Sequence, residues 1–360
     1  MLDLAVVVPT YNEKLNVDAL VDRLELVLVG LNWEVVFVDD DSPDGTADSL
    51  RALAQQRPHV RCLLRIGRRG LSRAVVEGIL STSAPLLAVM DADLQHDEAL
   101  LPSMLQKLED EQLDVVVASR YVAGGSVGEW SRGRAQLSRL ATRLVDAVIG
   151  TGLSDPMSGY FVVRRTVFES AVRRLSGEGY KILLDLLASA PSKPRVGELP
   201  YTFRPRTAGE SKLDSAVLWE FVMLLLEKRV GRWIPARFVL FSLVGASGVL
   251  VHFSVLWLTF RALGAGFALS QAAATLVAMT TNYALNNALT YRDRRHRGLG
   301  WVGGLLSFYA ICGLGVIANV GVASALFQRQ QDWLIAAAAG ALLGTIWNYI
   351  ASAAVTWRRG

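Results

Sequence analysis

Residues 85–96 read Pro-Leu-Leu-Ala-Val-Met-Asp-Ala-Asp-Leu-Gln-His. This short apolar run of the β type ends in polar side chains, with Asp91 and Asp93 on either side of the small Ala92. Similar apolar runs cover 4–9, 33–38, 60–64 and 114–118. Helical patterns lie between them, over 15–30, 45–56, 70–81 and 98–110. Strands that alternate with helices of this length predict an α/β domain, with a mostly parallel sheet covered on both faces.

Two further polar clusters follow apolar runs directly: Thr10-Tyr11-Asn12-Glu13 and Asp39-Asp40-Asp41-Ser42-Pro43-Asp44-Gly45-Thr46. In open parallel sheets, ligands bind beyond the carboxyl ends of the strands. We therefore expect both clusters to meet the Asp91–His96 cluster at one crevice.

The residue types in this crevice argue against a dinucleotide-binding or phosphate-loop enzyme and favour a divalent-metal site. The first strand is followed neither by a glycine-rich dinucleotide fingerprint nor by a phosphate-loop lysine motif. Asp-x-Asp at a strand end suits Mg²⁺ or Mn²⁺, held by one or two carboxylates while diphosphate oxygens complete the coordination. An isolated Asp-x-Asp is often just a turn or a helix cap, but its position beside two other polar strand ends favours a metal site.

The second half of the chain is much more apolar than the first. The 360 residues suffice for two domains, and 52% of them are hydrophobic, with a mean hydropathy of +0.32. Four stretches contain no Asp, Glu, Lys or Arg, and each exceeds the about 20 residues that cross a bilayer. They cover 238–260, 267–289, 301–327 and 333–357. The second has several amides, which are expected to face neighbouring helices.

Charge segregates with hydropathy. Residues 236–360 hold nine Arg and two Asp, whereas the first 235 residues carry a net charge of −3 and show no nucleic-acid footprint. Four of these Arg lie between the second and third stretches, and two end the chain. By the positive-inside rule, both termini and the first half should be cytoplasmic, consistent with an N-terminus that lacks a signal-peptide pattern. Two cysteines, one in each half, exclude a disulfide framework.

The apolar half contains an internal repeat. Phe241-x6-Gly248-Val249 recurs as Phe308-x6-Gly315-Val316, and Asn282-Tyr283-x6-Thr290-Tyr291-Arg292 recurs as Asn348-Tyr349-x6-Thr356-Trp357-Arg358. The pattern predicts a duplicated two-helix hairpin, which serves either for packing and anchoring or as a transport path. We expect a cytosolic domain over 1–212, interfacial amphipathic helices over 213–235 and a four-span membrane domain over 236–360.

The ordered motifs resemble one enzyme family. They are Pro9-Thr-Tyr11-Asn-Glu13, Val38-Asp-Asp40-Asp-Ser-Pro-Asp44-Gly-Thr, Gly70-Leu-Ser72, Asp91-Ala-Asp93-Leu-Gln95-His96, Ser119-Arg120-Tyr121, Asp155-Pro-Met-Ser158-Gly-Tyr160 and Gly209-Glu-Ser-Lys212-Leu. This series resembles family-two GT-A glycosyltransferases, and most closely the dolichyl- or polyprenyl-phosphate mannose synthases. The apolar half resembles the GtrA-like membrane family.

The resemblance implies roles for individual residues. A nucleotide pocket would comprise Pro9, Tyr11, Glu13, Val38 and Asp40. The metal and donor-phosphate group would comprise Asp91, Asp93 and Gln95, with Ala92 beside them. Arg206 and Lys212 resemble a basic pair that covers the diphosphate, and Lys181 stands at a donor-side position. Turn or cap roles are expected for Asp39, Asp41 and Asp44, and Arg204 is expected to be a surface charge.

The acceptor of such an enzyme is a lipid phosphate. If 134–148 is helical, Arg134 and Ser138 are i,i+4 neighbours, so a guanidinium and a hydroxyl can hold one phosphate. In the related enzymes, the residues matching Arg120, Arg134 and Ser138 bind the acceptor phosphate. Nearby Arg132 and Arg139 are expected to be surface charges attracted to anionic lipid.

The resulting expectation is a multi-pass enzyme of the cell (cytoplasmic) membrane. It would transfer mannose from GDP-mannose to a polyprenyl phosphate with inversion, using Mg²⁺ or Mn²⁺ and no nucleic acid; the sequence names no protein partner. One alternative is a polyprenyl-phosphate glucosyltransferase that uses UDP-glucose. A second is a lipid-linked-sugar transporter or flippase, in which the soluble half only binds ligand. A processive polysaccharide synthase is disfavoured because Lys228–Trp233 stands in the wrong context for its product-gripping motif.

Overall fold

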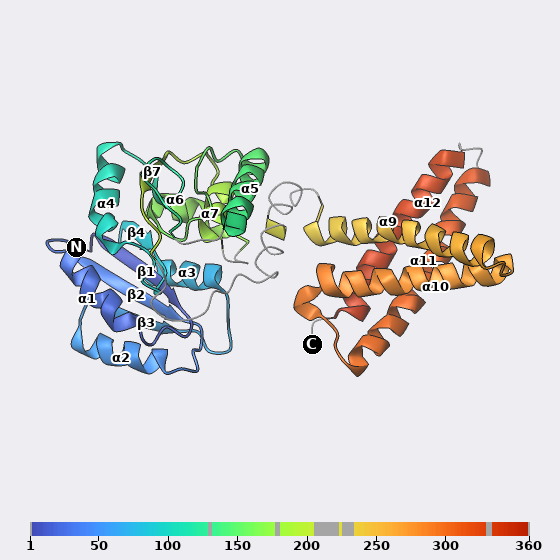
Figure 1. Cartoon of the computed structure of the whole chain (residues 1–360), viewed down its shortest axis with the longest axis horizontal. Coiled ribbons are helices and arrows are strands. Elements are labelled where there is room, and N and C mark those ends of the chain that lie inside the picture. The colour runs from blue at the N-terminus through green and yellow to red at the C-terminus, as the bar shows by residue number, and fades with distance from the viewer. Residues whose placement is uncertain are drawn as a thin grey trace. The chain divides into compact units, whose positions relative to one another are not determined.

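The computed structural model divides into two compact units, Met1–Arg229 and Val230–Gly360. It describes residues 2–128, 132–176, 181–204, 223–224, 234–328 and 333–358. Figure 1 shows the α/β organisation of the first unit and the helices of the second. Apart from residues 223–224 and 234–235, the expected interfacial segment 213–235 lies outside the described residues.

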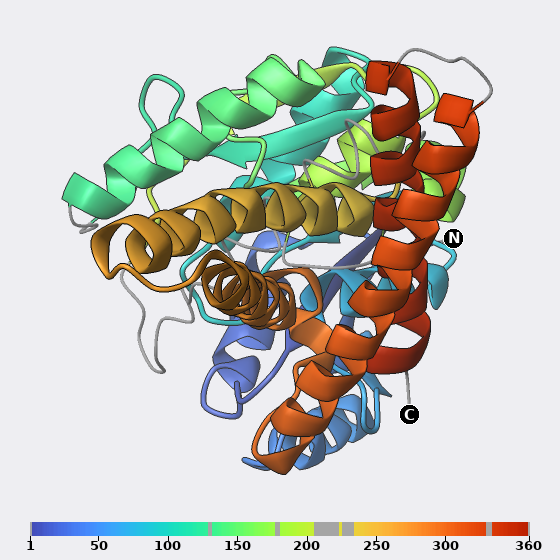
Figure 2. The same cartoon turned by 90° about the vertical axis from the view of Figure 1, so that its right-hand side faces the viewer.

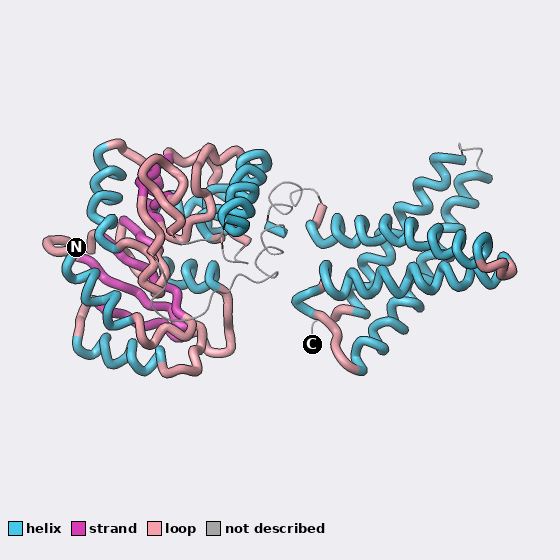
Figure 3. Tube along the Cα trace, viewed as in Figure 1, coloured by secondary structure: helices cyan, strands magenta, loops and turns pink. Residues whose placement is uncertain are grey.

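The first unit is built on a seven-stranded sheet with the order β3-β2-β1-β4-β6-β5-β7. Neighbouring strands run parallel except for β6, which is antiparallel to both β4 and β5. Figure 3 shows these strands in the centre of the unit. The strands are β1 (Leu4–Thr10), β2 (Trp33–Asp39), β3 (Val60–Leu64), β4 (Leu86–Val89), β5 (Val115–Ser119), β6 (Phe161–Arg164) and β7 (Val196–Pro200).

Helices cover both faces of this sheet because alternate strand residues point to opposite faces and are apolar on each. Along β1, Leu4, Val6 and Val8 pack with α1, α2 and α4, whereas Ala5 and Val7 pack with α3, α6 and α7. The helices are α1 (Val17–Val27), α2 (Thr46–Gln56), α3 (Leu71–Leu80), α4 (Leu101–Asp110, after a 3₁₀ turn at Glu98–Leu100), α5 (Arg132–Ile149), α6 (Arg165–Ala171, followed by a 3₁₀ turn at Val172–Arg174) and α7 (Ile182–Ser189).

The sequence-based prediction of a mostly parallel α/β sheet is confirmed. All five predicted strands and the helices between them form within a few residues of the predicted bounds. Neither β6 nor β7 was predicted. The antiparallel β6 is only four residues long and breaks the simple alternation of strand and helix, and half-buried β7 lacks a continuous apolar run.

The second unit consists, in its described residues, of helices. They are α9 (Ala236–Leu256), α10 (Phe267–Leu285), α11 (Leu299–Gln328) and α12 (Trp333–Ala351), with π-helical turns at Trp257–Ala262, Asn286–Thr290 and Ser352–Thr356 and a 3₁₀ turn at Arg292–Arg294. Helix α9 pairs with α10, and α11 with α12 (Figures 1 and 2). Two of the described helical segments, Ala236–Ala262 and Leu299–Ile317, are long and apolar enough to cross a membrane.

The two hairpins repeat the same packing contact. A Cβ at Gly248 of α9 would overlap the Asn282 amide of α10, and a Cβ at Gly315 of α11 would overlap the Asn348 amide of α12. Both second helices then continue into a π-helical turn. The repeat in the sequence therefore corresponds to a repeated Asn-on-Gly contact, in which glycine lets the paired helices approach closely.

Aromatic and amide side chains close one end of this unit. The Tyr291 and Trp357 rings stack with centroids 4.1 Å apart, and the Trp357 indole nitrogen donates to Oδ1 of Asn287 at 3.2 Å. The same oxygen accepts the backbone N–H of His296 at 2.9 Å. Asn286 and Asn287, in the π-helical turn after α10, are almost fully buried, so these amides face protein, as expected for a segment of this polarity.

Candidate functional site

The carboxyl ends of β2, β1 and β4 lie side by side, because these strands are neighbours in the sheet. Thr10 pairs in register with Asp39, and its hydroxyl donates to Asp39 Oδ1 at 3.2 Å. Strand β4 pairs with β1 on the side opposite β2, and Asp91 follows the end of β4. The expected meeting of the three polar clusters at the carboxyl ends of these strands is confirmed.

Backbone donors of the first cluster bind side chains of the second. The N–H of Asn12 donates to Ser42 Oγ at 2.9 Å, and the N–H of Glu13 donates to Thr46 Oγ1 at 3.0 Å. Asp44 accepts the N–H of Lys14 and both the N–H and the hydroxyl of Thr46; burial opposes ionisation, but these hydrogen bonds hold its pKa below the usual value. Asp44 thus fills the turn-and-cap role expected from the sequence.

The backbone of each cluster includes a residue with positive φ. Asn12, Asp41 and Leu94 have φ of 60°, 57° and 61°. Among the described residues, Gln112 is the one other non-glycine residue of this kind. Such conformations cost energy and concentrate at functional sites. Their distribution therefore supports this edge of the sheet as the site.

Two residues predicted for the nucleotide pocket contact the loop after β3. The guanidinium of Arg69 lies 4.3 Å from the centroid of the Tyr11 ring, a cation–π distance. Asp40 accepts the N–H of Gly70 at 2.7 Å and forms an ion pair with the buried Arg65. No role was predicted for Arg65 or Arg69, because nothing in the local sequence pattern relates either residue to Asp40 or Tyr11.

The other predicted pocket residues come from β1 and β2 or the turn after β1. Pro9 pairs in register with Val38, which is fully buried. Glu13 accepts a hydrogen bond from the Asn16 amide at 2.7 Å.

The predicted metal-binding side chains lie just beyond β4. The Asp91 side chain is 38% exposed, whereas Asp93 and Ala92 are almost fully buried. Asp93 Oδ1 accepts the N–H of Gln95 at 3.2 Å, and the Gln95 amide nitrogen donates to the Arg204 carbonyl at 2.9 Å. That bond uses the amide nitrogen, so the oxygen is the Gln95 atom suited to a cation.

This donor set fits Mg²⁺ or Mn²⁺ shared with a substrate. No group of three or more His, Cys, Asp or Glu side chains that could hold a metal occurs among the described residues. Mg²⁺ typically binds one or two carboxylates and takes its other ligands from water and substrate phosphates. Two carboxylates and an amide oxygen meet that requirement.

His96 is a buried neighbour of this group whose role the sequence did not reveal. Its Nδ1 accepts the N–H of Asp91 at 3.1 Å, its Nε2 lies 3.8 Å from Asp91 Oδ2, and its ring stacks on Tyr160 at 5.1 Å. Burial lowers the pKa of His96 to about 4, and the nearby Asp93 charge only partly opposes this. Gly159 borders both side chains: a Cβ there would be 3.3 Å from Asp91 Oδ2 and 3.6 Å from His96 Cε1.

The expectation that Arg204 is a mere surface charge is wrong. Its guanidinium donates to Asp97 at 2.6 Å and to Glu98 at 2.8 Å, and its N–H donates to the Gln95 carbonyl at 3.0 Å. Because Gln95 in turn binds the Arg204 carbonyl, this residue fixes the backbone next to the predicted metal ligands. Arg206 and Lys212, the predicted basic pair, lie outside the described residues.

Lys181 stands at the start of α7, where its Nζ donates to the Met157 carbonyl at 3.5 Å. Met157 is two residues from Gly159, which borders Asp91. Lys181, the predicted donor-side lysine, thus contacts the Met157–Gly159 segment, which borders the Asp91 side chain.

Arg120 follows β5 and is held by a carboxylate. Its Nε donates to Asp155 Oδ2 at 2.7 Å, and its Nη2 donates to Oδ1 at 2.9 Å. Burial disfavours the charged guanidinium, but the hydrogen bonds and charge of Asp155 outweigh it and raise the pKa of Arg120. Arg120 is therefore permanently charged and paired with the Asp155 carboxylate.

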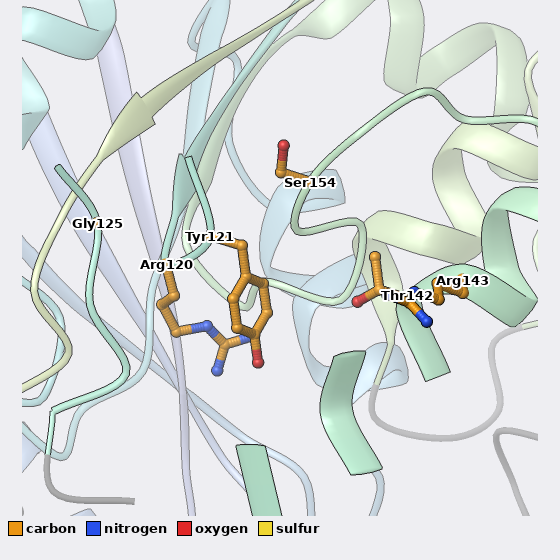
Figure 4. Close-up of a pocket in the computed structure, with 6 residues that line it drawn as sticks. All are labelled: Arg120, Tyr121, Gly125, Thr142, Arg143 and Ser154. Atoms are coloured by element: carbon orange, nitrogen blue, oxygen red, sulfur yellow. The ribbon is translucent and has the colours of Figure 1, made fainter. Parts of the chain in front are cut away.

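A cavity of about 400 Å³ opens beside this pair (Figure 4). The Tyr121 hydroxyl donates to Ser138 Oγ of α5 at 2.7 Å, so predicted acceptor residues Arg120 and Ser138 are linked through Tyr121. Helix α5 contains Arg134, as predicted, but that side chain, like those of Arg132 and Arg139, lies outside the described part of the structure. The described lining residues are Arg120, Tyr121, Gly125, Thr142, Arg143 and Ser154.

Two family models match the chain, one in each unit. "Glycosyl transferase family 2" matches residues 5–171, and "GtrA/DPMS, transmembrane domain" matches residues 240–357. The second match and the apolar helices identify a membrane protein.

One curated relative matches almost the whole chain. A dolichol-phosphate mannosyltransferase of Pyrococcus furiosus is 33% identical over 99% of this chain and 99% of its own length. The Saccharomyces cerevisiae protein of that name is 36% identical, covering 67% of this chain and 92% of its own.

Among solved structures, glucosyl-3-phosphoglycerate synthase of Mycobacterium tuberculosis, in complex with Mn²⁺, UDP-glucose and phosphoglyceric acid, matches with a TM-score of 0.50. It is 17% identical, and the match covers 63% of this chain and 79% of that chain. This likeness supports the GT-A fold of the first unit. With a full-length relative and a family match in each unit, the chain belongs to the dolichol-phosphate mannosyltransferases, family-2 glycosyltransferases that here carry a GtrA/DPMS transmembrane domain.

Proposed function

We propose that this enzyme transfers mannose from GDP-mannose to a polyprenyl phosphate, giving polyprenyl phosphate β-mannose and GDP. The observation that carries the proposal is the alignment of the whole chain with a dolichol-phosphate mannosyltransferase. The polar edge of the sheet and the cavity beside Arg120 supply suitable chemistry for the two substrates.

The donor would lie along the carboxyl ends of β2, β1 and β4. Tyr11 offers a ring on which the base can stack, and Glu13 and Asp40 are carboxylates suited to base N–H or ribose hydroxyl groups. The Arg69 guanidinium, which lies over the Tyr11 ring, would move aside or stack on the base when the nucleotide binds. Lys181, Arg206 and Lys212 would supply positive charge to the diphosphate.

Asp91, Asp93 and Gln95 would hold a Mg²⁺ or Mn²⁺ ion, which when bound offsets the negative charge of the departing diphosphate. His96 keeps the Asp91 backbone in place through its Nδ1.

The acceptor phosphate would bind in the cavity near Arg120, with Arg134 and Ser138 of α5. A phosphate monoester has a second pKa of about 6 and is largely dianionic at neutral pH, so its oxygen needs no strong protein base. That oxygen attacks C1 of mannose as the bond from C1 to GDP breaks, and a single displacement inverts the α-linkage to β. Arg120 orients the attacking phosphate, and orientation supplies much of the rate.

The second unit would anchor this reaction to the bilayer. Four spans, over about 238–260, 267–289, 301–327 and 333–357, would leave both termini and the catalytic unit in the cytoplasm. An interfacial segment over 213–235 would keep the active site at the membrane surface, where the phosphate of a polyprenyl lipid lies. The arginines between the second and third stretches favour this orientation in the cell membrane.

Variants of the two carboxylates test the proposal. In detergent-purified full-length protein, Asp91→Asn and Asp93→Asn should each abolish mannosyl transfer and weaken Mn²⁺ binding in the presence of GDP. Asp110→Asn removes an exposed carboxylate at the end of α4 and should change neither. Near-wild-type turnover by both site variants, after metal removal and restoration, would contradict the assigned metal site.

A further inference from the structure

The carboxylate of Asp155 binds Arg120 at three points. Asp155 Oδ2 accepts both the backbone N–H of Arg120, at 3.1 Å, and its Nε–H, at 2.7 Å, while Oδ1 accepts from Nη2 at 2.9 Å. Asp155 is fully buried, and the Arg120 side chain is 10% exposed. A two-oxygen, two-nitrogen pairing of this kind fixes the plane of a guanidinium. The third bond fixes the backbone that carries it.

Asp155 is itself held by the sheet. Glu198 of β7 accepts the backbone N–H of Ser154 at 3.0 Å and that of Asp155 at 3.1 Å. Three residues further on, the Ser158 hydroxyl donates to the Ala118 carbonyl of β5 at 2.8 Å. The segment that carries the carboxylate is thus tied to both strands beside Arg120. A fully buried carboxylate paired in this way is unsuited to be a general base.

The same pairing pattern recurs at the opposite ends of β5 and β7, between Asp114 and Arg195. Asp114 accepts the backbone N–H of Arg195 at 2.8 Å, and its two oxygens accept from Nε and Nη2 at 3.4 Å each. That Arg side chain is 62% exposed. The chain therefore contains an exposed and looser counterpart of the Arg120–Asp155 pair, which joins the starts of β5 and β7.

Arg120 differs from Arg195 in that it lines the 400 Å³ cavity with Tyr121, whose hydroxyl binds Ser138. A buried ion pair contributes little to stability on balance, because desolvation offsets the attraction between its charges. Such a pair can, however, hold its cation in the orientation in which it meets a bound anion.

We propose that Asp155 is a positioning residue for the acceptor: it holds the Arg120 guanidinium in the orientation in which it meets the phosphate of the polyprenyl substrate. The inference rests on the proposed function. Asp155 touches neither substrate and acts through Arg120. Its loss should therefore impair acceptor use and leave the nucleotide pocket unchanged.

The test compares Asp155→Asn with Asp114→Asn in the full-length protein. The amide that replaces the Asp155 carboxylate has one accepting oxygen instead of two, so the two-point pairing with the guanidinium is lost. We expect the KM for polyprenyl phosphate to rise about tenfold or more, with GDP affinity within twofold of wild type. Asp114→Asn, the matched control, should leave both values within twofold of wild type. Unchanged acceptor KM in a folded Asp155→Asn variant would overturn the inference.

A double variant separates positioning from folding. Asp155→Asn leaves a buried cation unpaired, whereas Arg120→Gln/Asp155→Asn leaves no buried charge at either position. If Asp155 acts through Arg120, the double variant and the single variant Arg120→Gln should have the same KM for polyprenyl phosphate. A double variant at least tenfold worse than Arg120→Gln would refute positioning through Arg120. If wild-type protein itself transfers nothing to polyprenyl phosphate, the proposed function fails, and with it this inference; normal wild-type transfer with unaffected variants refutes the inference alone.

Discussion

Replacing Gly159 with alanine should weaken metal binding without unfolding the protein. A Cβ at this position would lie 3.3 Å from Asp91 Oδ2, 3.6 Å from His96 Cε1 and 3.8 Å from Asp91 Cγ. At 3.3 Å the carboxylate has to give way by a few tenths of an ångström. The Asp91 side chain is 38% exposed, so it can move toward solvent at little cost in stability.

That displacement is large for a metal ligand. Ligand distances in metal sites hold to about 0.2 Å, and changes in the groups that orient ligands typically cost about 10- to 100-fold in metal affinity. The corresponding loss in binding free energy is about 1.4 to 2.8 kcal/mol. We expect Gly159→Ala to reduce Mn²⁺ affinity in the presence of GDP by this factor.

The assay is titration of Mn²⁺ followed by electron paramagnetic resonance, with a thermal melt of each variant. Gly197→Ala is the control for an added methyl group in the same unit. Its Cβ would come within 2.5 Å of Leu113 and 2.9 Å of Lys107, so it should destabilise the unit by about 1–3 kcal/mol and leave Mn²⁺ affinity unchanged. Mn²⁺ binding by Gly159→Ala within twofold of wild type would refute the reasoning.

Two further predictions concern the nucleotide and the membrane unit. Tyr11→Ala should lower GDP affinity in calorimetric titration by the about 1–3 kcal/mol that stacking of a base on an aromatic ring contributes, whereas Tyr11→Phe should retain it; equal affinity for both variants would exclude stacking on Tyr11. Gly248→Val and Gly315→Val should each lower the melting temperature in detergent, because the added side chain displaces the Asn282 or Asn348 amide. Gly245→Val is the control, because a Cβ at Gly245 meets open space. An equal fall in melting temperature in this control would contradict a specific role for the Asn-on-Gly contacts.

The sequence predicted the parallel part of the catalytic unit well because local pattern and tertiary role agree there. Each buried strand is a run of β-branched or other apolar residues, and each covering helix has a single apolar face. Polar residues that begin directly after such a strand are placed by topology alone, so the meeting of the Thr10, Asp39 and Asp91 clusters at the carboxyl ends of neighbouring strands could be predicted without any coordinates.

Residues that act through contacts distant in sequence could not be predicted in this way. Asp155 is 35 positions from Arg120, and Arg204 is more than 100 positions from Asp97 and Glu98. No periodicity or spacing relates these partners. His96 stands within the Asp91–His96 cluster, but its buried, neutral state depends on packing against Tyr160 of a later segment. Arg204 was mistaken for a surface charge for the same reason.

Sugar transfer by the purified full-length protein tests the proposed function most directly. The protein would be offered polyprenyl phosphate with either GDP-mannose or UDP-glucose, before and after removal of divalent metal. We expect mannosyl transfer from GDP-mannose alone, lost on metal removal and restored by Mg²⁺ or Mn²⁺. Glucosyl transfer from UDP-glucose would contradict the donor assignment, and transfer from neither donor would contradict the proposed reaction.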